Sequence, residues 1–427
     1  MRSFTFSHNV RFLRFTRSLK DASIPPEKAI PSFREQVART SPVKSFSETI
    51  KYPRIARNIL FFLSASGFAY GIAAIDTNIT TNIWAEYVPK VSPHVIWSVR
   101  DPTTNDMRVV RDAILIKKVQ NKVNSISESL SNAPMIVKEL VLYTYAKFGE
   151  AYITSTEGRR VGWGLCAVNT AVWIAWQIPR LRPFMHLHFT HNPLSGRTYT
   201  MLTSMFSHSS LIHLLFNCMA LTSFASATST WMTREQRLAP SQLQEATASY
   251  HFLAFFISAG LFSSLVSHVV SARFRFPRMV SQLARSQQPA STTKSTLTST
   301  LVAAAKSPAT ATTEAGPTIG ASLGASGAIY AAVAISALAF PEAQVSLVFP
   351  PTGSIPIEYG VGALVLLDIV GALRGWRLFD HFAHLGGAAF GAAYYAYGMR
   401  FWDDLRVMFA NMLAKPDGKK RERGDKP

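Results

Sequence analysis

A chain of 427 residues that is 48% hydrophobic and only 16% charged is too apolar for a typical soluble enzyme or a disordered chain. A polytopic membrane protein fits this composition better. The formal net charge of +19 raises nucleic-acid binding as a function, but the lysines and arginines are scattered between apolar segments and form no basic stripe interleaved with aromatic residues. We therefore expect no nucleic acid among the partners.

The N-terminal stretch MRSFTFSHNVRFLRFTRSLK combines arginines with Phe, Leu, Val and Ser, and has no acidic residue before Asp21. This pattern is typical of a mitochondrial presequence. A secretory signal needs an uninterrupted apolar core, which the arginines prevent, and a solvated basic tail is the remaining alternative. Residues 1–50 are therefore assigned to a presequence or disordered segment outside the fold.

Seven stretches of the chain are apolar enough to span a hydrocarbon core about 30 Å thick. They are predicted at about 58–75, 161–178, 206–226, 250–270, 319–340, 357–373 and 382–397. No internal repeat is evident, which argues against transporters built from two related halves. The sequence therefore predicts an all-α polytopic membrane protein.

Two segments outside the spans differ in composition. Residues 77–160 contain AILIKKVQNKVNSISESL and KELVLYTYAKFG, whose spacing predicts amphipathic helices at a membrane surface, with a small soluble domain or plain linker as the alternative. Residues 272–318 are rich in Ser, Thr, Ala and Pro, which predicts a disordered loop. The expected domains are an extra transmembrane helix with its amphipathic linker (51–160), a six-helix core (161–397) and a basic C-terminal tail (398–427).

The cysteines and one group of histidines offer little for metal binding. Cys166 and Cys218 both lie in apolar segments, and two cysteines build neither a disulfide framework nor a zinc knuckle. His186, His188 and His191 in FMHLHFTH have metal-like spacing, but no pattern of acids or thiolates accompanies them. We expect no metal and no cofactor.

Three short motifs place polar residues inside predicted spans, where such residues are costly and therefore candidates for function. In SHSSLIHLLFN, His213 and Asn217 are four residues apart and share one helical face, with His208 a little over one turn earlier. In GASG, Ser326 lies among small residues. On a straight helix it would be on the order of 10 Å below the membrane surface.

The third motif, DHFAHLGGAAFG, places His381 and His384 in the first turn of the last span and spaces Gly387 and Gly391 as a small-xxx-small packing face. Each motif alone also has a simpler explanation. Glycines let membrane helices approach, and a histidine or Asn217 can form an ordinary interhelical hydrogen bond or take part in a proton relay.

Together the three motifs supply the parts of a nucleophilic site. A serine hydroxyl is a poor nucleophile without a neighbouring base, which His384 can supply. The glycines before Ser326 and behind His384 allow their two helices to approach closely. Acyl transfer also needs hydrogen-bond donors aimed at the developing oxyanion, and His213, Asn217 and the Ser326 backbone N–H fit that role.

The sequence GASG, with HxxxN upstream and HLGGxxxG downstream, resembles the rhomboid intramembrane serine proteases over residues 161–397. The resemblance implies an all-α rhomboid fold with a six-helix core, here preceded by one extra N-terminal transmembrane helix. It also implies a serine endopeptidase that hydrolyses peptide bonds in or near transmembrane helices by a serine–histidine dyad.

The resemblance assigns roles to five residues. Ser326 is implied to be the nucleophile and His384 the base. His213 and Asn217 are implied to stabilise the oxyanion, and Tyr330, one turn beyond the serine, to stack on the catalytic imidazole.

The presequence, the extra span and the run RPFMHLHFTHNP make the chain resemble the mitochondrial subgroup of this family, which includes the presenilin-associated rhomboid-like proteases. This implies a multi-pass protein of the mitochondrial inner membrane that cleaves single-span membrane proteins. The substrate classes implied are dynamin-like GTPases, peroxidase precursors and kinases. The Ser/Thr/Ala-rich loop departs from compact rhomboids.

Charge in the loops predicts the orientation in the membrane. The loops after spans two, four and six carry many lysines and arginines, whereas the alternate short loops offer only Arg234 and Arg237. By the positive-inside tendency, the N-terminus and the active-site opening face the matrix. The basic C-terminal stretch GKKRERGDK falls on the opposite side and argues against this orientation.

Three alternative interpretations are disfavoured. Asp380, four residues before His384, would supply a third catalytic group, but the family works with a dyad and a solvated helix start is the expected role. A catalytically inactive rhomboid-like protein that binds client transmembrane helices has the same fold, but such relatives usually lose the serine or the histidine. A channel or transporter is disfavoured by the Ser/Gly pairing and by an absence of acids within the spans.

Overall fold

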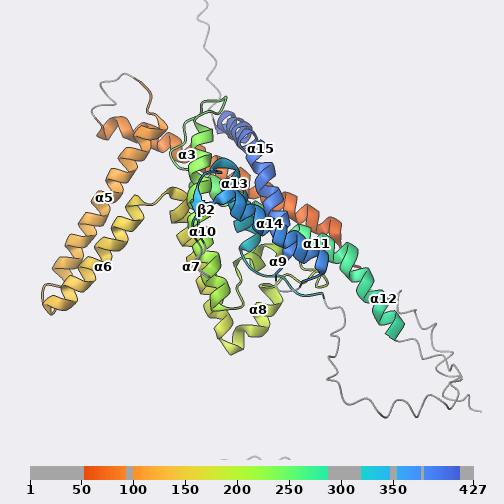
Figure 1. The fold of residues 1–427 in the computed structure, drawn as a ribbon. Helices are drawn as coiled ribbons and strands as arrows, with labels where there is room; N and C mark the ends of the chain where they lie inside the picture. Colours follow the sequence, from red (N-terminus) through yellow and green to blue (C-terminus); the bar gives the residue numbers. More distant parts are fainter. Residues whose placement is uncertain (1–51, 93–99, 287–318, 347–352, 377–378, 414–427) are drawn as a thin grey trace, which may run out of the picture. The chain divides into compact units, whose positions relative to one another are not determined.

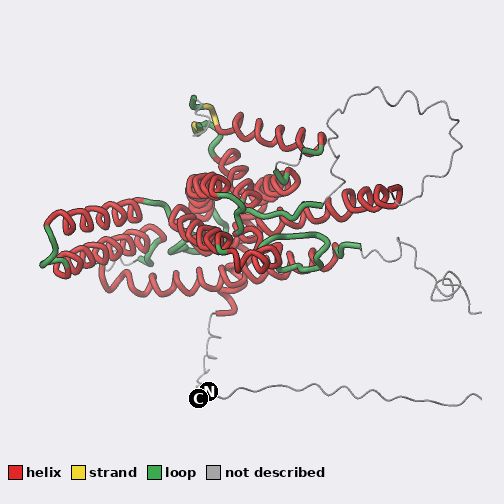
Figure 2. Tube along the Cα trace, turned by 90° about the horizontal axis from the view of Figure 1, so that it is seen from below, coloured by secondary structure: helices red, strands yellow, loops and turns green. Residues whose placement is uncertain are grey.

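The computed structural model describes residues 52–92, 100–286, 319–346, 353–376 and 379–413. Within these ranges the chain is predominantly helical (Figure 1, Figure 2). The predicted presequence, most of the predicted loop and the end of the predicted tail lie outside the described residues.

In chain order the helices are α3 (Ile55–Val91), α5 (Thr104–Ser129), α6 (Met135–Thr154), α7 (Glu157–Gln177), α8 (Arg182–His188), α9 (Thr200–Thr203), α10 (Leu211–Gln236), α11 (Ser249–Val270), α12 (Phe276–Ser286), α13 (Ser326–Ala339), α14 (Ile357–Arg374) and α15 (His381–Leu413). Short helical turns occupy Pro179–Leu181, Ser204–Phe206 and Ser271–Arg275. Two-residue strands β1 (Gln344–Val345) and β2 (Ile355–Pro356) pair antiparallel. Helices occupy all seven predicted spans, which confirms the all-α class.

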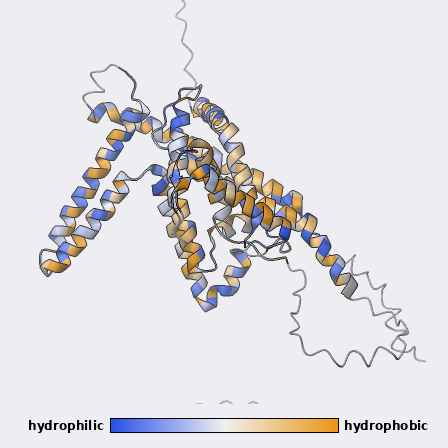
Figure 3. Cartoon of the chain, in the orientation of Figure 1, coloured by the Kyte–Doolittle hydropathy of each residue, from blue (hydrophilic) through white to orange (hydrophobic). Residues whose placement is uncertain are grey.

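Three described helical segments are long and apolar enough to cross a membrane: Ile55–Val91, Leu211–Gln236 and Ser249–Leu283. Helix α7 with its bent continuation Pro179–His188 is a fourth candidate, and α13 is a shorter apolar helix. Figure 3 shows long apolar stretches along α7 and α11. The chain is therefore a polytopic membrane protein.

The predicted start of the fifth span at residue 319 is wrong, because α13 begins at Ser326. Ser322 pairs with His191 in an extended bridge, and Gly324 has a φ of +124°, which an α-helix excludes and which glycine adopts readily. Ser326 is therefore the first residue of its helix and not about 10 Å along it.

The third span also begins later than predicted, at Leu211 rather than 206. The Ser210 side chain caps α10 by accepting a hydrogen bond from the His213 N–H at 3.2 Å. A serine at this position satisfies one of the N–H groups that a helix start leaves without an intrahelical partner.

Several helices are longer than predicted. Helix α3 continues to Val91, α12 extends the fourth span to Ser286, and α15 continues to Leu413. The two long extensions lie side by side, since Asn78 of α3 bonds the Arg406 carbonyl at 2.9 Å and its own Oδ1 accepts from the Arg406 guanidinium at 3.0 Å. Asn78 and Arg406, which lower the mean hydropathy of these two extensions, are thus hydrogen-bonded to each other inside the fold. The predicted linker helices are confirmed as α5 and α6, and their place at a membrane surface stays a prediction.

Helix α13 packs against α10, α11 and α15. Its buried residues are mostly alanines, so neighbouring helices approach its backbone closely. A Cβ atom at Gly387 would lie 2.0 Å from the Gly327 carbonyl oxygen, and one at Gly391 would lie 2.3 Å from the Ala331 carbonyl oxygen. The small-xxx-small face of α15 therefore packs directly on the backbone of α13, as predicted.

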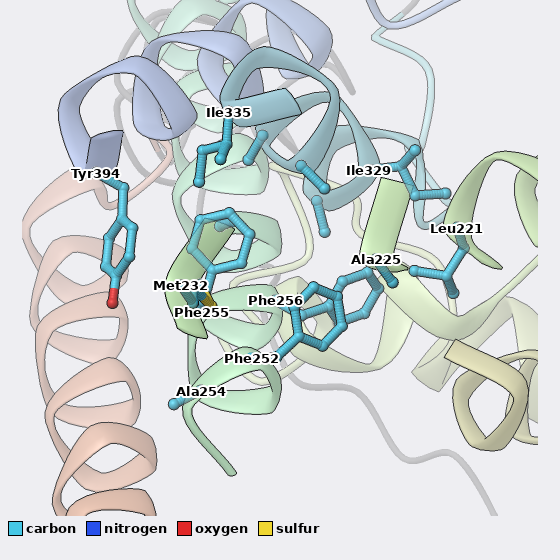
Figure 4. Packing of buried hydrophobic residues seen from close by; sticks show 14 of the residues in the cluster. Leu221, Ala225, Met232, Phe252, Ala254, Phe255, Phe256, Ile329, Ile335 and Tyr394 are labelled. Carbon is cyan, nitrogen blue, oxygen red and sulfur yellow. The ribbon is translucent and has the colours of Figure 1, made fainter. Parts of the chain in front are cut away.

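Aromatic side chains of α11 fill the core beside α13 (Figure 4). Phe252, Phe255 and Phe256 are fully buried there. Tyr394 of α15 stacks on Tyr70 of α3 with ring centroids 6.2 Å apart. The extra N-terminal helix is thus packed on the same core as the helices that carry the motifs.

Helix α5 is attached to the core through polar contacts. Arg111 forms an ion pair of 2.6 Å with Glu157 of α7, and the Thr104 backbone N–H donates to the Gln244 side chain at 2.7 Å. The neighbouring Glu245 is fully buried, and neither of its carboxyl oxygens has a hydrogen-bond partner. A buried carboxyl without such partners is costly to ionise.

Burial raises the pKa of Glu245 from its ordinary value of 4.5 to about 7, although Arg406 and Arg108 oppose the shift. Between these two pH values the folded chain holds a proton that the unfolded chain has lost, so Glu245 lowers stability as the pH rises through this window. We expect Glu245→Gln to raise the free energy of unfolding at pH 8 by at most on the order of 3 kcal/mol, and with it the thermal unfolding midpoint. The difference should shrink as the pH falls and vanish only below the ordinary pKa of 4.5, and an equal shift at pH 8 and at this low pH would contradict this explanation.

Candidate active site

Ser326 and His384 are brought together by the close packing of α13 and α15. The Ser326 hydroxyl lies 2.9 Å from His384 Nε2, within hydrogen-bond distance. The serine is the first residue of α13 and the histidine lies in the first turn of α15. Ser326 is partly exposed, whereas His384 is only 8% exposed. This geometry allows the imidazole to take the hydroxyl proton.

The ring of Tyr330 covers one face of the His384 imidazole. The two ring centroids are 4.3 Å apart and the rings are tilted by only 8°. Because Tyr330 lies one turn after Ser326 on α13, it restricts rotation of the imidazole while Nε2 faces the serine.

Two hydrogen-bond donors lie beside the serine hydroxyl. The Ser326 N–H lies at the start of α13 and therefore has no partner within its own helix. The His213 ring lies beside Gly324, where an added Cβ would be 2.9 Å from the ring and 4.0 Å from the Ser326 hydroxyl oxygen. Gly324 is thus needed both for its positive φ and for this close approach.

Asn217 lies on the next turn of α10 after His213. Its side-chain N–H donates to the His213 carbonyl at 2.8 Å, which leaves a second N–H for another acceptor. The ring of His208 lies 5.0 Å from that of His213. The structure therefore gathers the histidines and the asparagine of the first motif at the end of α13 that carries Ser326.

Asp368 is a residue that the sequence analysis missed. It lies on α14, is only 3% exposed, and places Oδ1 3.2 Å from His384 Nδ1 and 2.6 Å from His381 Nδ1. The expectation that the spans contain no acidic residue is wrong, since Asp368 falls inside the predicted span 357–373. The available signal was a single acid in the apolar run LVLLDIVGAL.

Asp380 has a structural role in this site. Its carboxylate accepts hydrogen bonds from the Ser267 hydroxyl at 2.5 Å and from the Ala383 N–H at 3.2 Å. It therefore caps the start of α15, and among the described residues its carboxylate bonds Ser267 and Ala383 rather than the His384 ring.

The three histidines with metal-like spacing have separate partners. The His186 ring packs against Trp176 at 4.8 Å, and His188 Nδ1 bonds the Tyr199 hydroxyl at 2.6 Å. His191 bonds His268 at 3.0 Å. In the part of the chain that the structure describes, no three His, Cys, Asp or Glu side chains are grouped to hold a metal ion.

A serine–histidine pair at the start of a short apolar helix, with hydrogen-bond donors beside it, can support nucleophilic catalysis. Residues 195–401 match the Rhomboid domain family, which confirms the resemblance expected from the motifs.

Several curated proteins that this chain resembles carry names that place them in mitochondria. The chain is 33% identical over 265 residues to presenilin-associated rhomboid-like protein A, mitochondrial, of Danio rerio, covering 59% of this chain and 54% of that protein. It is 31% identical over 264 residues to presenilin-associated rhomboid-like protein, mitochondrial, of Homo sapiens and of Mus musculus, covering 59% of this chain and 55% of each. The chain spans about half the length of the relatives that it matches.

Proposed function

We propose that this protein is an intramembrane serine endopeptidase that cleaves inner-membrane proteins of mitochondria within or near their transmembrane helices. The observation that carries the proposal is the 2.9 Å contact between the Ser326 hydroxyl and His384 Nε2 inside a rhomboid domain. His213, Asn217 and Tyr330 are proposed to support the reaction from around this pair.

The proposed reaction follows from the geometry. Ser326 Oγ attacks the scissile carbonyl while His384 Nε2 takes the hydroxyl proton. The negative charge on the carbonyl oxygen is stabilised by the Ser326 N–H, His213 and Asn217. His384 then protonates the leaving amine and activates the water that hydrolyses the acyl-enzyme.

The substrates are proposed to be single-span membrane proteins, with dynamin-like GTPases, peroxidase precursors and kinases as the candidate classes. The carbonyls of a helix are already hydrogen-bonded, so the substrate helix must unwind locally before attack. Segments with small residues and helix breakers should therefore be preferred. The lipid bilayer is the other proposed partner, since the helices around the site are apolar.

The site is proposed to open toward the matrix, on the side of the N-terminus. Asn58 near the start of α3 lies 2.7 Å from His268, which bonds His191 at 3.0 Å. His191 in turn pairs with Ser322, four residues before Ser326. The start of the extra helix and the serine are therefore at the same end of the helices, which supports placing both on one side of the membrane.

The test is cleavage of a single-span reporter by the purified full-length protein in liposomes, with labelling of Ser326 by a fluorophosphonate as an independent readout. Wild type should cleave and be labelled, and Ser326→Ala should do neither while keeping its unfolding midpoint. Stable binding of the reporter without cleavage or labelling would instead favour the client-binding alternative.

A further inference from the structure

Helix α14 is apolar on its outer faces and carries one acid on its inner face. Its exposed side chains include Leu366, Leu367 and Leu373, whereas Asp368 and Gly371 are buried. A buried carboxylate in a membrane protein is costly and therefore requires partners. The partners of Asp368 are the histidines of α15.

The hydrogen-bond directions at this carboxylate are fixed by the chemistry of the site. If the Ser326 hydroxyl donates to His384 Nε2, the proton of the neutral ring is on Nδ1. That Nδ1–H then donates to Asp368 Oδ1 at 3.2 Å. The ring of Tyr330 stacks on the same imidazole, with the two ring centroids 4.3 Å apart.

A second histidine holds the carboxylate independently of the first. His381 is 2% exposed, and its Nδ1–H donates to the same Oδ1 at 2.6 Å. The His381 ring lies against Gly371, where an added Cβ would be 2.4 Å from the ring. Gly371 therefore makes room on α14 for the ring, one turn after the aspartate.

We propose that Asp368 is a positioning residue of the protease: anchored by His381, its carboxylate fixes the tautomer of His384 and stabilises the imidazolium that forms during the reaction. This inference rests on the proposed function and extends the dyad to a Ser326–His384–Asp368 triad. Asp368 itself contacts no reacting atom. It acts through His384, as the aspartate of soluble serine proteases does.

The proposal predicts a change in pH dependence that loss of packing would not cause. The titratable groups facing His384 are Asp368 of α14, Tyr330 of α13, His213 of α10 and the neighbouring His381. Among the described residues, Asp368 is the acid that bonds the His384 ring, while the carboxylate of Asp380 at the start of α15 bonds Ser267 and the Ala383 N–H instead. Without Asp368 the imidazolium is less stable, so the acid limb of the pH–rate profile should move to lower pH.

The experiment compares wild type with Asp368→Asn, using the full-length protein in liposomes. We expect kcat to fall about 100-fold with KM nearly unchanged. This is less than the loss of about 10⁴-fold in a soluble protease, because Tyr330 still orients the ring. Asp404→Asn, which removes an exposed carboxylate from α15, is the matched control and should retain kcat and the acid limb.

A second pair of variants tests the anchor and does not require Asp368 to be changed. His381→Leu removes the donor to Asp368, and we expect kcat to fall about 10-fold. His381→Asn keeps an N–H donor close to the position of Nδ1 and should recover most of that loss. Equal activity of the leucine and asparagine variants would remove His381 from the proposal.

The outcomes separate this inference from the function on which it rests. Wild type that cleaves the reporter, together with an Asp368→Asn variant that keeps both kcat and the acid limb, would leave the protease intact and overturn the role of Asp368. Wild type that neither cleaves nor reacts with a fluorophosphonate would overturn the proposed function, and this inference with it.

Discussion

Ser326→Ala and His384→Ala are expected to reduce cleavage to the same residual level, and the double variant is expected to be no worse than either single variant. The two side chains share one hydrogen bond of 2.9 Å and act in one proton transfer, so removing either leaves the other without a function. For groups that act as a unit, the expected loss in kcat is about 10⁴–10⁶-fold.

The measurement is kcat for all three variants on one reporter in liposomes, with thermal unfolding midpoints to show that each variant is folded. Ser209→Ala, an exposed serine before α10, is the control and should keep wild-type kcat. Losses that add in the double variant would mean that the two residues contribute independently, which contradicts the proposed proton transfer.

Gly387→Ala is expected to reduce kcat by about 100-fold or more, although the residue touches no substrate. Its new Cβ would lie 2.0 Å from the Gly327 carbonyl oxygen, and a backbone atom cannot rotate away. Helix α15 must therefore move off α13 and carry His384 away from Ser326. A displacement of about 1 Å is enough to cost about 100-fold in rate, and the overpacking should also destabilise the fold by about 1–3 kcal/mol.

The control for this substitution is another glycine with space around it. Gly362 lies in α14 and Gly164 in α7, and an added Cβ at either meets nothing within 4 Å. Gly362→Ala and Gly164→Ala should therefore leave kcat and the unfolding midpoint nearly unchanged. Wild-type activity in Gly387→Ala would show that α15 tolerates the shift and that the close packing does not align the dyad.

Much of the candidate site could be predicted from the sequence because its chemistry is local. His213 and Asn217 share a face through helical spacing, and the glycines around Ser326 and behind His384 indicate which histidine can approach the serine as its base. The spacing of Gly387 and Gly391 predicts a close helix contact, which the structure confirms. Apolar length likewise predicts the class of the fold.

The tertiary structure alone decided the features that depend on contacts between distant segments. The start of α13 at Ser326 follows from the pairing of Ser322 with His191, which hydropathy does not record. Asp368 remained unnoticed because one acid hardly changes the mean hydropathy of an apolar run, and its partner His384 lies on another helix. Sequence thus determined which residue types are available in each span, whereas packing determined which of them meet, because a hydrogen bond depends on distance in space and not on separation along the chain.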